Sequence, residues 1–123
     1  MNSDLNNYLE LCCEKEDIND LIIVSNEGLP IALASSILTS DQILVSGMCT
    51  ALKCIGRELI RETMDSDFKR MLVDCTEGVI LIQPLNPRAI LVASCRTASV
   101  LKDIDIPSIQ LYLNNPTNSL VAL

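Results

Sequence analysis

Apolar residues recur in five short runs that are rich in Val, Ile, Leu and Ala, a composition typical of β-strands. The predicted strands are 20–25, 29–36, 68–75, 79–85 and 89–95. Most of these runs are apolar at successive positions rather than at alternate ones, which predicts a sheet covered on both faces. Two of the connections end in glycine, at Gly28 and Gly78, and fit tight hairpin turns. Pro30 cannot donate a ladder hydrogen bond, so its strand is expected at an edge of the sheet or to begin there.

Two other stretches, 4–13 and 39–64, have apolar residues every three to four positions, which predicts amphipathic helices. Thr39 and Gln42 have the spacing of a capping box at the start of the longer helix. The apolar arc of that helix comprises Leu44, Val45, Met48, Ala51, Leu52, Ile55 and Leu59. With six to seven turns by the helical repeat, this is the longest predicted element of the chain.

The C-terminal part of the chain is less regular. Thr97 is placed to cap a helix from Ala98, and Pro107 is expected to limit or kink that helix. Residues 108–113 alternate like a strand but also fit one or two helical turns. The sequence does not assign a structure to 114–123.

The order of elements predicts an α+β fold in a single domain, 1–123. We expect a five-stranded, mainly antiparallel sheet. The long helix would cover one face, and short terminal helices would cover the other. The 123 residues and 13.5 kDa allow one domain and no more.

Composition excludes several classes of function. The chain has no histidine, which removes Ser-His-Asp triads, Cys-His pairs and histidine metal ligands. Its net charge is −7 and only 2% of its residues are aromatic, so nucleic-acid binding is not expected. No apolar run approaches the length of a bilayer span, and the start does not read as a signal peptide. We therefore expect a cytoplasmic protein without membrane insertion.

No motif for catalysis, a cofactor or a metal stands out. The four glycines are too scattered to form a phosphate-binding loop. The acidic pairs at 65–67 and 103–105 are interpreted as turn or cap residues rather than metal ligands. The six cysteines lack the C-x-x-C spacing and are expected to be mostly buried thiols, with Cys12 and Cys13 as the expected exceptions. We therefore expect no enzyme, no cofactor and no metal.

The segment Leu-Ile-Ile-Val-Ser-Asn-Glu-Gly-Leu-Pro-Ile at 21–31 resembles the first hairpin of the Roadblock family. This family includes dynein light chains of the Roadblock type and MglB-like proteins. The Glu-Gly-x-Pro-apolar core of its pattern is matched by residues 27–31. The resemblance covers 4–104 and leaves 105–123 as an uncertain C-terminal segment, where Pro107 interrupts the longer last helix of some members.

The resemblance implies the same five-stranded fold, with long helices that pack beside each other in a dimer. It also implies pairing of the third strands at the sheet edge. The partner would be a second copy or a related Roadblock protein, and the dimer would be a platform for a Ras-like small GTPase or a motor or scaffold complex. Members of the family are not themselves nucleotide hydrolases.

The long helix supplies candidate partner-binding residues. Lys53, Arg57 and Arg61 are spaced four apart and form a basic ridge in an otherwise acidic chain. Such a ridge is either a solvated helix face or a surface that meets an acidic partner. The candidate residues on this side of the helix are Gln42, Ser46, Lys53, Arg57 and Arg61.

Dimer contacts are predicted from two features. Small residues in a row allow another helix to approach closely, or else allow close packing on the sheet of the same chain. The third strand is a candidate for edge pairing, although its lysine and arginine could instead protect a monomer. The candidate dimer residues are Gly47, Ala51, Cys54, Lys69, Met71 and Val73.

The sequence therefore favours a non-enzymatic dimeric binding module that regulates or scaffolds a Ras-like small GTPase. Two alternatives stay open. One is a small-molecule or thiol-redox sensor that uses a pocket or reactive thiols. The other is a structural subunit of a larger complex.

Overall fold

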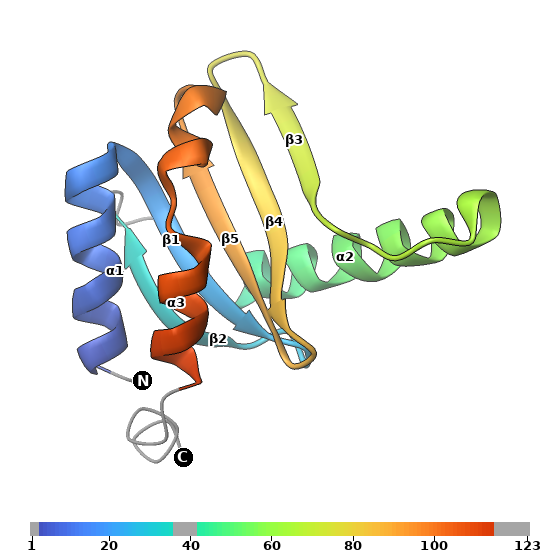
Figure 1. Ribbon diagram of the computed structural model, residues 1–123, viewed down its shortest axis with the longest axis horizontal. Helices are drawn as coiled ribbons and strands as arrows, with labels where there is room; N and C mark the ends of the chain where they lie inside the picture. Colours follow the sequence, from blue (N-terminus) through green and yellow to red (C-terminus); the bar gives the residue numbers. More distant parts are fainter. Residues whose placement is uncertain (1–2, 36–41, 115–123) are drawn as a thin grey trace.

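Five antiparallel strands form one sheet with helices on both of its faces (Figure 1), which confirms the predicted α+β fold. The computed structural model describes residues 3–35 and 42–114. The helices are α1 (Ser3–Glu16), α2 (Gln42–Met64), the 3-10 helix η1 (Ala98–Asp103) and α3 (Ile106–Leu113). The strands are β1 (Ile18–Ser25), β2 (Pro30–Ser35), β3 (Met71–Cys75), β4 (Gly78–Asn86) and β5 (Ala89–Cys95).

The strand order in the sheet is β2-β1-β5-β4-β3. Strand β5 is central, β1 and β4 flank it, and β2 and β3 lie at the edges. All four neighbouring pairs are antiparallel. At the centre, Ile22 of β1 is opposite Val92 of β5. The three central strands are buried on both faces, as their continuous apolar runs predict.

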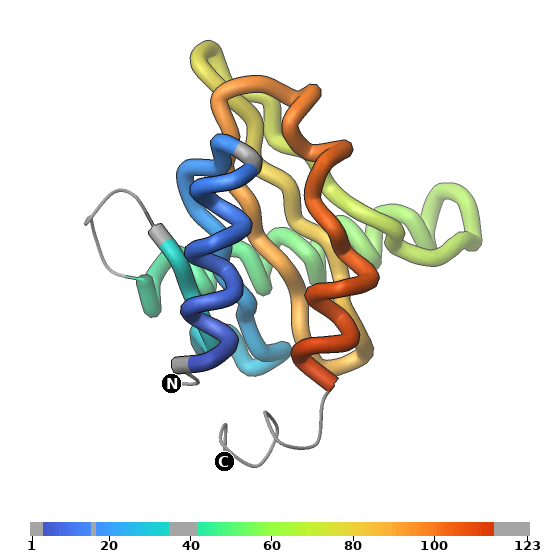
Figure 2. The backbone as a smooth tube through the Cα atoms, turned by 60° about the vertical axis from the view of Figure 1, so that its left-hand side comes forward, coloured from blue at the N-terminus to red at the C-terminus, as the bar shows by residue number. Residues whose placement is uncertain are grey.

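Two apolar cores lie on opposite sides of the sheet. Helices α1 and α3 run side by side on one face (Figure 2), where Leu5, Leu9 and Ile109 pack on the sheet. The other core lies toward α2 and includes Ile82 and Ile90. The predicted arrangement of one long helix opposite the terminal helices is therefore confirmed.

The first hairpin has the predicted geometry. Gly28 has φ +85°, in the left-handed region that favours glycine. The amide of Gly28 donates to the carbonyl of Ser25, and the amides of Glu27 and Leu29 lie within hydrogen-bonding distance of the Ser25 hydroxyl. Pro30 opens edge strand β2, where a missing amide donor does not break the interior of the sheet.

The C-terminal segment differs from the prediction. The Thr97 side chain does not cap the following helix, which is a short 3-10 helix rather than an α-helix. Asp105 caps α3 by accepting a hydrogen bond from the Ser108 amide. Pro107 therefore lies in the first turn of a helix, where its missing N–H has no cost, and does not end one. The 108–113 stretch is helical rather than extended.

The start of one strand differs from the prediction, and two predicted features lie outside the described residues. The third strand begins at Met71 rather than Phe68. The predicted cap at Thr39 lies outside the described residues, as do residues 115–123 of the C-terminal segment.

Candidate functional site

Helix α2 crosses the sheet face opposite α1 and α3, and its C-terminal end extends beyond the edge of the sheet (Figure 1). The residues of α2 that are buried are small: Ser46, Cys49 and Gly56. A Cβ atom placed on Gly28 would lie 3.4 Å from the Cα of Gly47, so the first hairpin turn lies close to the helix. The fully buried residues of α2 are thus small, and Val45 packs against the core beside them.

Large aliphatic side chains of α2 are exposed to solvent. We call them the apolar face: Leu44, Met48, Leu52, Ile55 and Leu59. Their exposed fractions run from 39% for Leu52 to 65% for Ile55. They recur at helical spacing and form one stripe along the helix. Contiguous apolar patches on a soluble domain mark interaction sites, which makes this stripe the candidate functional surface.

Edge strand β3 lies at the sheet edge beyond which α2 extends, and it is also exposed. It pairs with β4 on one side and presents unpaired backbone groups on the other. Leu72 is 53% exposed and Val73 is 36% exposed. A Cβ atom on Gly56 would lie 2.8 Å from side-chain atoms of both Phe68 and Met71, so the segment that leads into β3 is packed against α2. The apolar face and the edge strand therefore belong to one side of the molecule.

The predicted partner-binding residues divide into two groups in the structure. Arg57 and Arg61 are exposed, and a guanidinium nitrogen of Arg61 lies 3.1 Å from a carboxylate oxygen of Glu58. Gln42 and Lys53 are half-buried. Ser46 is fully buried, so its assignment to a partner surface is wrong. The helix side interpreted as solvated in fact turns partly toward the sheet.

The predicted dimer residues fall mostly at the surface. The exposed ones are Gly47, Ala51, Cys54, Lys69 and Val73. Met71 is half-buried. The structure brings these positions of α2 and β3 to the same side of the molecule, but whether they contact a second subunit stays a prediction.

Sequence reasoning did not single out the apolar face as a surface. Helical periodicity identifies the stripe but does not say which side of the helix packs on the sheet. The signal that could have found it is the row of small residues on the buried side, at Ser46, Cys49 and Gly56. Such residues allow a helix to lie close to a sheet, whereas five large aliphatic side chains would hold it away.

All six cysteines are free thiols, and their environments differ. Cys49 and Cys95 are buried, and Cys12 and Cys13 are half-buried. Burial, together with the negative charge of Asp20, raises the pKa of the Cys13 thiol to about 12. Cys54 and Cys75 are exposed, so the expectation that Cys12 and Cys13 would be the most accessible thiols is wrong.

The residues that the structure describes contain no cluster of three or more cysteine, aspartate or glutamate side chains placed to hold a metal ion. Asp105 of the second acidic pair acts as a helix cap, as predicted. Hydrogen bonds from the Ser108 hydroxyl and amide hold the pKa of Asp105 below its usual value. Within the described part of the chain, no helix has the length and apolar character needed to cross a membrane.

Comparison with known families identifies this arrangement of one long helix on a five-stranded sheet. The family model described as the Roadblock/LC7 domain matches residues 6–94. The chain belongs to the Roadblock/LC7 family. The resemblance seen in the first hairpin is thereby confirmed, and the family is one of regulatory and binding domains rather than enzymes.

Solved structures share the fold of this Roadblock/LC7 domain at low sequence identity. MglB of Myxococcus xanthus matches with a TM-score of 0.79 and 14% identity, over 95% of this chain and 97% of that one. A structure described as MglB with a tetrameric arrangement matches with a TM-score of 0.78 and 10% identity, over 99% and 92% of the two chains. A Roadblock/LC7 domain from Streptomyces avermitilis matches with a TM-score of 0.70 and 11% identity, over 85% and 93%. A search of curated protein sequences found no match.

Proposed function

We propose that this Roadblock/LC7 domain is a non-enzymatic dimeric module that regulates or scaffolds a Ras-like small GTPase in the cytoplasm. The observation that carries the proposal is the apolar face of α2, which is large, continuous and exposed. The dimer partner is a second copy or a related Roadblock protein.

The dimer follows from the cost of leaving the apolar face in water. Burying apolar surface contributes roughly 25 cal/mol per Å². Five large aliphatic side chains on one helix stripe therefore favour association with a similar stripe on another subunit. The unpaired edge of β3 lies on the same side. A single contact with another subunit would therefore cover both the apolar face and the unpaired backbone groups of β3.

The GTPase partner is supported by charge and by family. Arg57 and Arg61 are exposed on the C-terminal half of α2, where a second protein has access to them. Two guanidinium groups in a chain of net charge −7 are suited to an acidic patch on a partner. Relatives of the same fold include MglB.

Binding of small GTPases from the same genome, each loaded with GDP or GTP, tests this proposal directly. Isothermal titration calorimetry should give a saturable signal with at least one of them, and Arg57→Glu with Arg61→Glu should weaken it about tenfold or more. The matched control, Arg88→Glu with Arg96→Glu, makes the same change in net charge at exposed positions outside α2 and should leave the affinity unchanged.

Two results would contradict the proposal. One is no binding to any of the GTPases in either nucleotide state. The other is an equal loss of affinity in the two double variants, since that would mean that net charge rather than the α2 surface governs the interaction.

A further inference from the structure

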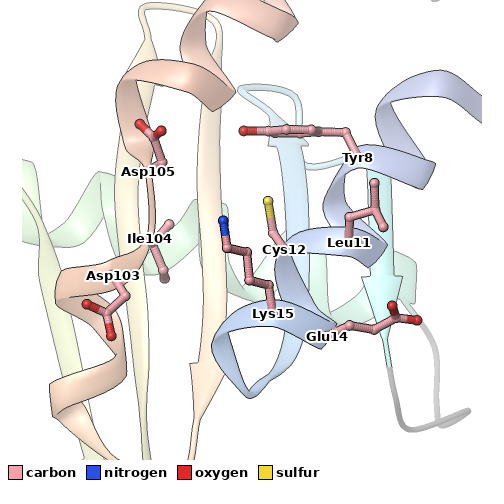
Figure 3. Close-up of a pocket in the computed structure, with 8 residues that line it drawn as sticks. All are labelled: Tyr8, Leu11, Cys12, Glu14, Lys15, Asp103, Ile104 and Asp105. Carbon is pink, nitrogen blue, oxygen red and sulfur yellow. The ribbon is translucent and has the colours of Figure 1, made fainter.

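The face opposite α2 carries a cavity that the proposed function does not use. An open cavity of about 550 Å³ lies between the C-terminal half of α1 and the segment that joins η1 to α3 (Figure 3). We propose that this cavity binds an arginine side chain from a basic segment of a partner protein. The residues that carry the argument are Tyr8, Glu14, Lys15 and Asp103, and we call them, with the cavity, the acidic groove.

An aromatic ring held in place forms one wall of the groove. Tyr8 stacks on Tyr112 of α3 with ring centroids 4.9 Å apart and an interplanar angle of 6°. Its ring reaches across the cavity toward the segment that carries Asp105 (Figure 3). A guanidinium group is planar and weakly hydrated and stacks readily on an aromatic ring. Because the stack with Tyr112 already fixes Tyr8, little further side-chain entropy is lost when a ligand binds.

Acidic residues lie on both sides of the groove. Glu14 and Asp103 line it from opposite sides, and their exposed carboxylates point outward to solvent (Figure 3). The described residues of α1, η1 and their adjoining turns include six exposed carboxylates and three exposed cationic groups. The carboxylates are those of Asp4, Glu10, Glu14, Asp17, Asp103 and Asp105, and the cations are those of Lys15, Arg96 and Lys102. This surface attracts a cationic segment and repels an anionic one.

One cation of this chain already occupies the groove. The ammonium group of Lys15 points between α1 and the 103–105 segment (Figure 3). The hydrogen bonds from Ser108 are the main cause of the lowered pKa of Asp105, and the charge of Lys15 adds to them. Lys15 is exposed and has a flexible stem, so an incoming guanidinium can displace it. The lysine is therefore both a sign that the groove favours a cation and a competitor for the site.

The aliphatic part of the lining fits the stem of an arginine and a neighbouring apolar residue. Leu11 is 63% exposed at the rim, and Ile104 is buried at the base. A partner segment that alternates basic and apolar residues would match this combination. The groove is on the opposite face of the sheet from the apolar face of α2, so it can be occupied together with the dimer contact (Figure 1).

Titration of the full-length protein with a capped peptide of alternating arginine and leucine tests the proposal by NMR at low salt. The amide shifts should centre on Leu11, Cys12 and Ile104 and spare α2. A matched peptide with lysine in place of arginine should bind more weakly, because an ammonium group lacks the planar stacking surface. A matched peptide with glutamate in place of arginine should not bind.

Variants of the groove distinguish specific binding in the groove from non-specific electrostatic attraction. Glu14→Lys with Asp103→Lys should weaken binding about tenfold or more. Glu62→Lys with Asp67→Lys, an equal change in net charge on the α2 side, should leave the affinity largely unchanged. Lys15→Ala should strengthen binding roughly two- to fivefold, because it removes the internal competitor.

The proposal is overturned if the arginine peptide does not bind, or if its shifts centre on α2. It is also overturned if the lysine or the glutamate peptide binds as tightly, or if the two double variants lose affinity equally. A weaker affinity for Lys15→Ala would mean that Lys15 supports the ligand rather than competing with it, which contradicts the proposed position of the cation.

Discussion

At the scale of single residues, two hydroxyl groups of α2 are unusual. Ser46 Oγ and Thr50 Oγ1 are buried and have no hydrogen-bond partner among the described residues. They are one turn apart on the helix side turned toward the sheet. A buried hydroxyl without a partner costs about 1–3 kcal/mol. The unpaired hydroxyl groups therefore reduce the stability gained when α2 packs on the sheet. The small size of the two residues nevertheless allows the helix to lie close to the sheet.

Ser46→Ala should accordingly raise the free energy of unfolding, by about 1 kcal/mol, because it removes a buried unpaired hydroxyl and increases helix propensity. Thermal or urea unfolding measures the change. Thr63→Ala is the control, since the Thr63 hydroxyl donates to the Leu59 carbonyl in the same helix and its loss should give no comparable gain. A clear loss of stability in Ser46→Ala would show that the hydroxyl does have a bonding partner in solution.

The cysteines provide a second prediction at this scale. Only the thiolate reacts with iodoacetamide, and burial raises the pKa of Cys13 to about 12. At pH 8 a thiol with that pKa is ionised only to about one part in ten thousand, by the definition of the pKa. Peptide mass spectrometry should therefore show Cys13 alkylated at least about a hundredfold more slowly than exposed Cys54 in the native protein.

The rate at Cys13 should rise as the pH rises toward about 12, because the thiolate fraction grows. Since the pKa is raised in the folded state, the thiol contributes to folding below pH 9, its ordinary value, and this contribution is lost as the pH rises through about 12. Equal alkylation of Cys13 and Cys54 at pH 8 would contradict the burial of Cys13.

At the scale of elements, the sequence predicted the sheet and the long helix because each has a strong and continuous pattern. The five strands, the Gly28 turn and edge strand β2 all follow from local residue preferences. The orientation of α2 did not follow, because an apolar arc fits either a sheet or a second subunit. The weakest predictions concerned 97–113, where Asp105 and Pro107 begin a helix that was expected to end.

The same uncertainty limited the prediction of the site. Charge and spacing pointed to Arg57 and Arg61, which are exposed, but also to Ser46, which is buried. The acidic groove was not predicted, because Tyr8 and Asp103 are distant in sequence and only the packing of α1 against the C-terminal segment brings them together. Periodicity describes one element at a time and cannot supply such a contact.

The exposed apolar face of α2 predicts that a charge placed in it prevents dimerisation. Ile55→Lys should yield a folded monomer, because a charge at the centre of the stripe would have to be buried without a partner in a dimer. Size-exclusion chromatography with light scattering measures the mass, and circular dichroism checks the fold. Leu111→Lys is the matched control, since Leu111 is 76% exposed on α3, on the opposite face of the sheet, and should leave the dimer intact.

If Ile55→Lys stays dimeric, the apolar face is not the contact. If both variants become monomeric, the contact includes α3 and the assignment to α2 is wrong.

At the scale of the whole molecule, the two faces of the sheet differ in character. The α2 side, with edge strand β3, is apolar and carries two exposed arginines. The α1 and α3 side is acidic around a cavity. The hydrophobic content of 49% is divided between the two cores of the sheet and the exposed apolar face. We propose that this apolar side joins two chains.

Sedimentation equilibrium of the unmodified protein at micromolar concentration tests whether two chains associate. One chain has a mass of 13.5 kDa, so a homodimer has about 27 kDa. We expect that mass, with dissociation only on dilution. A mass of 13.5 kDa that persists as the concentration is raised would contradict self-association through the apolar face.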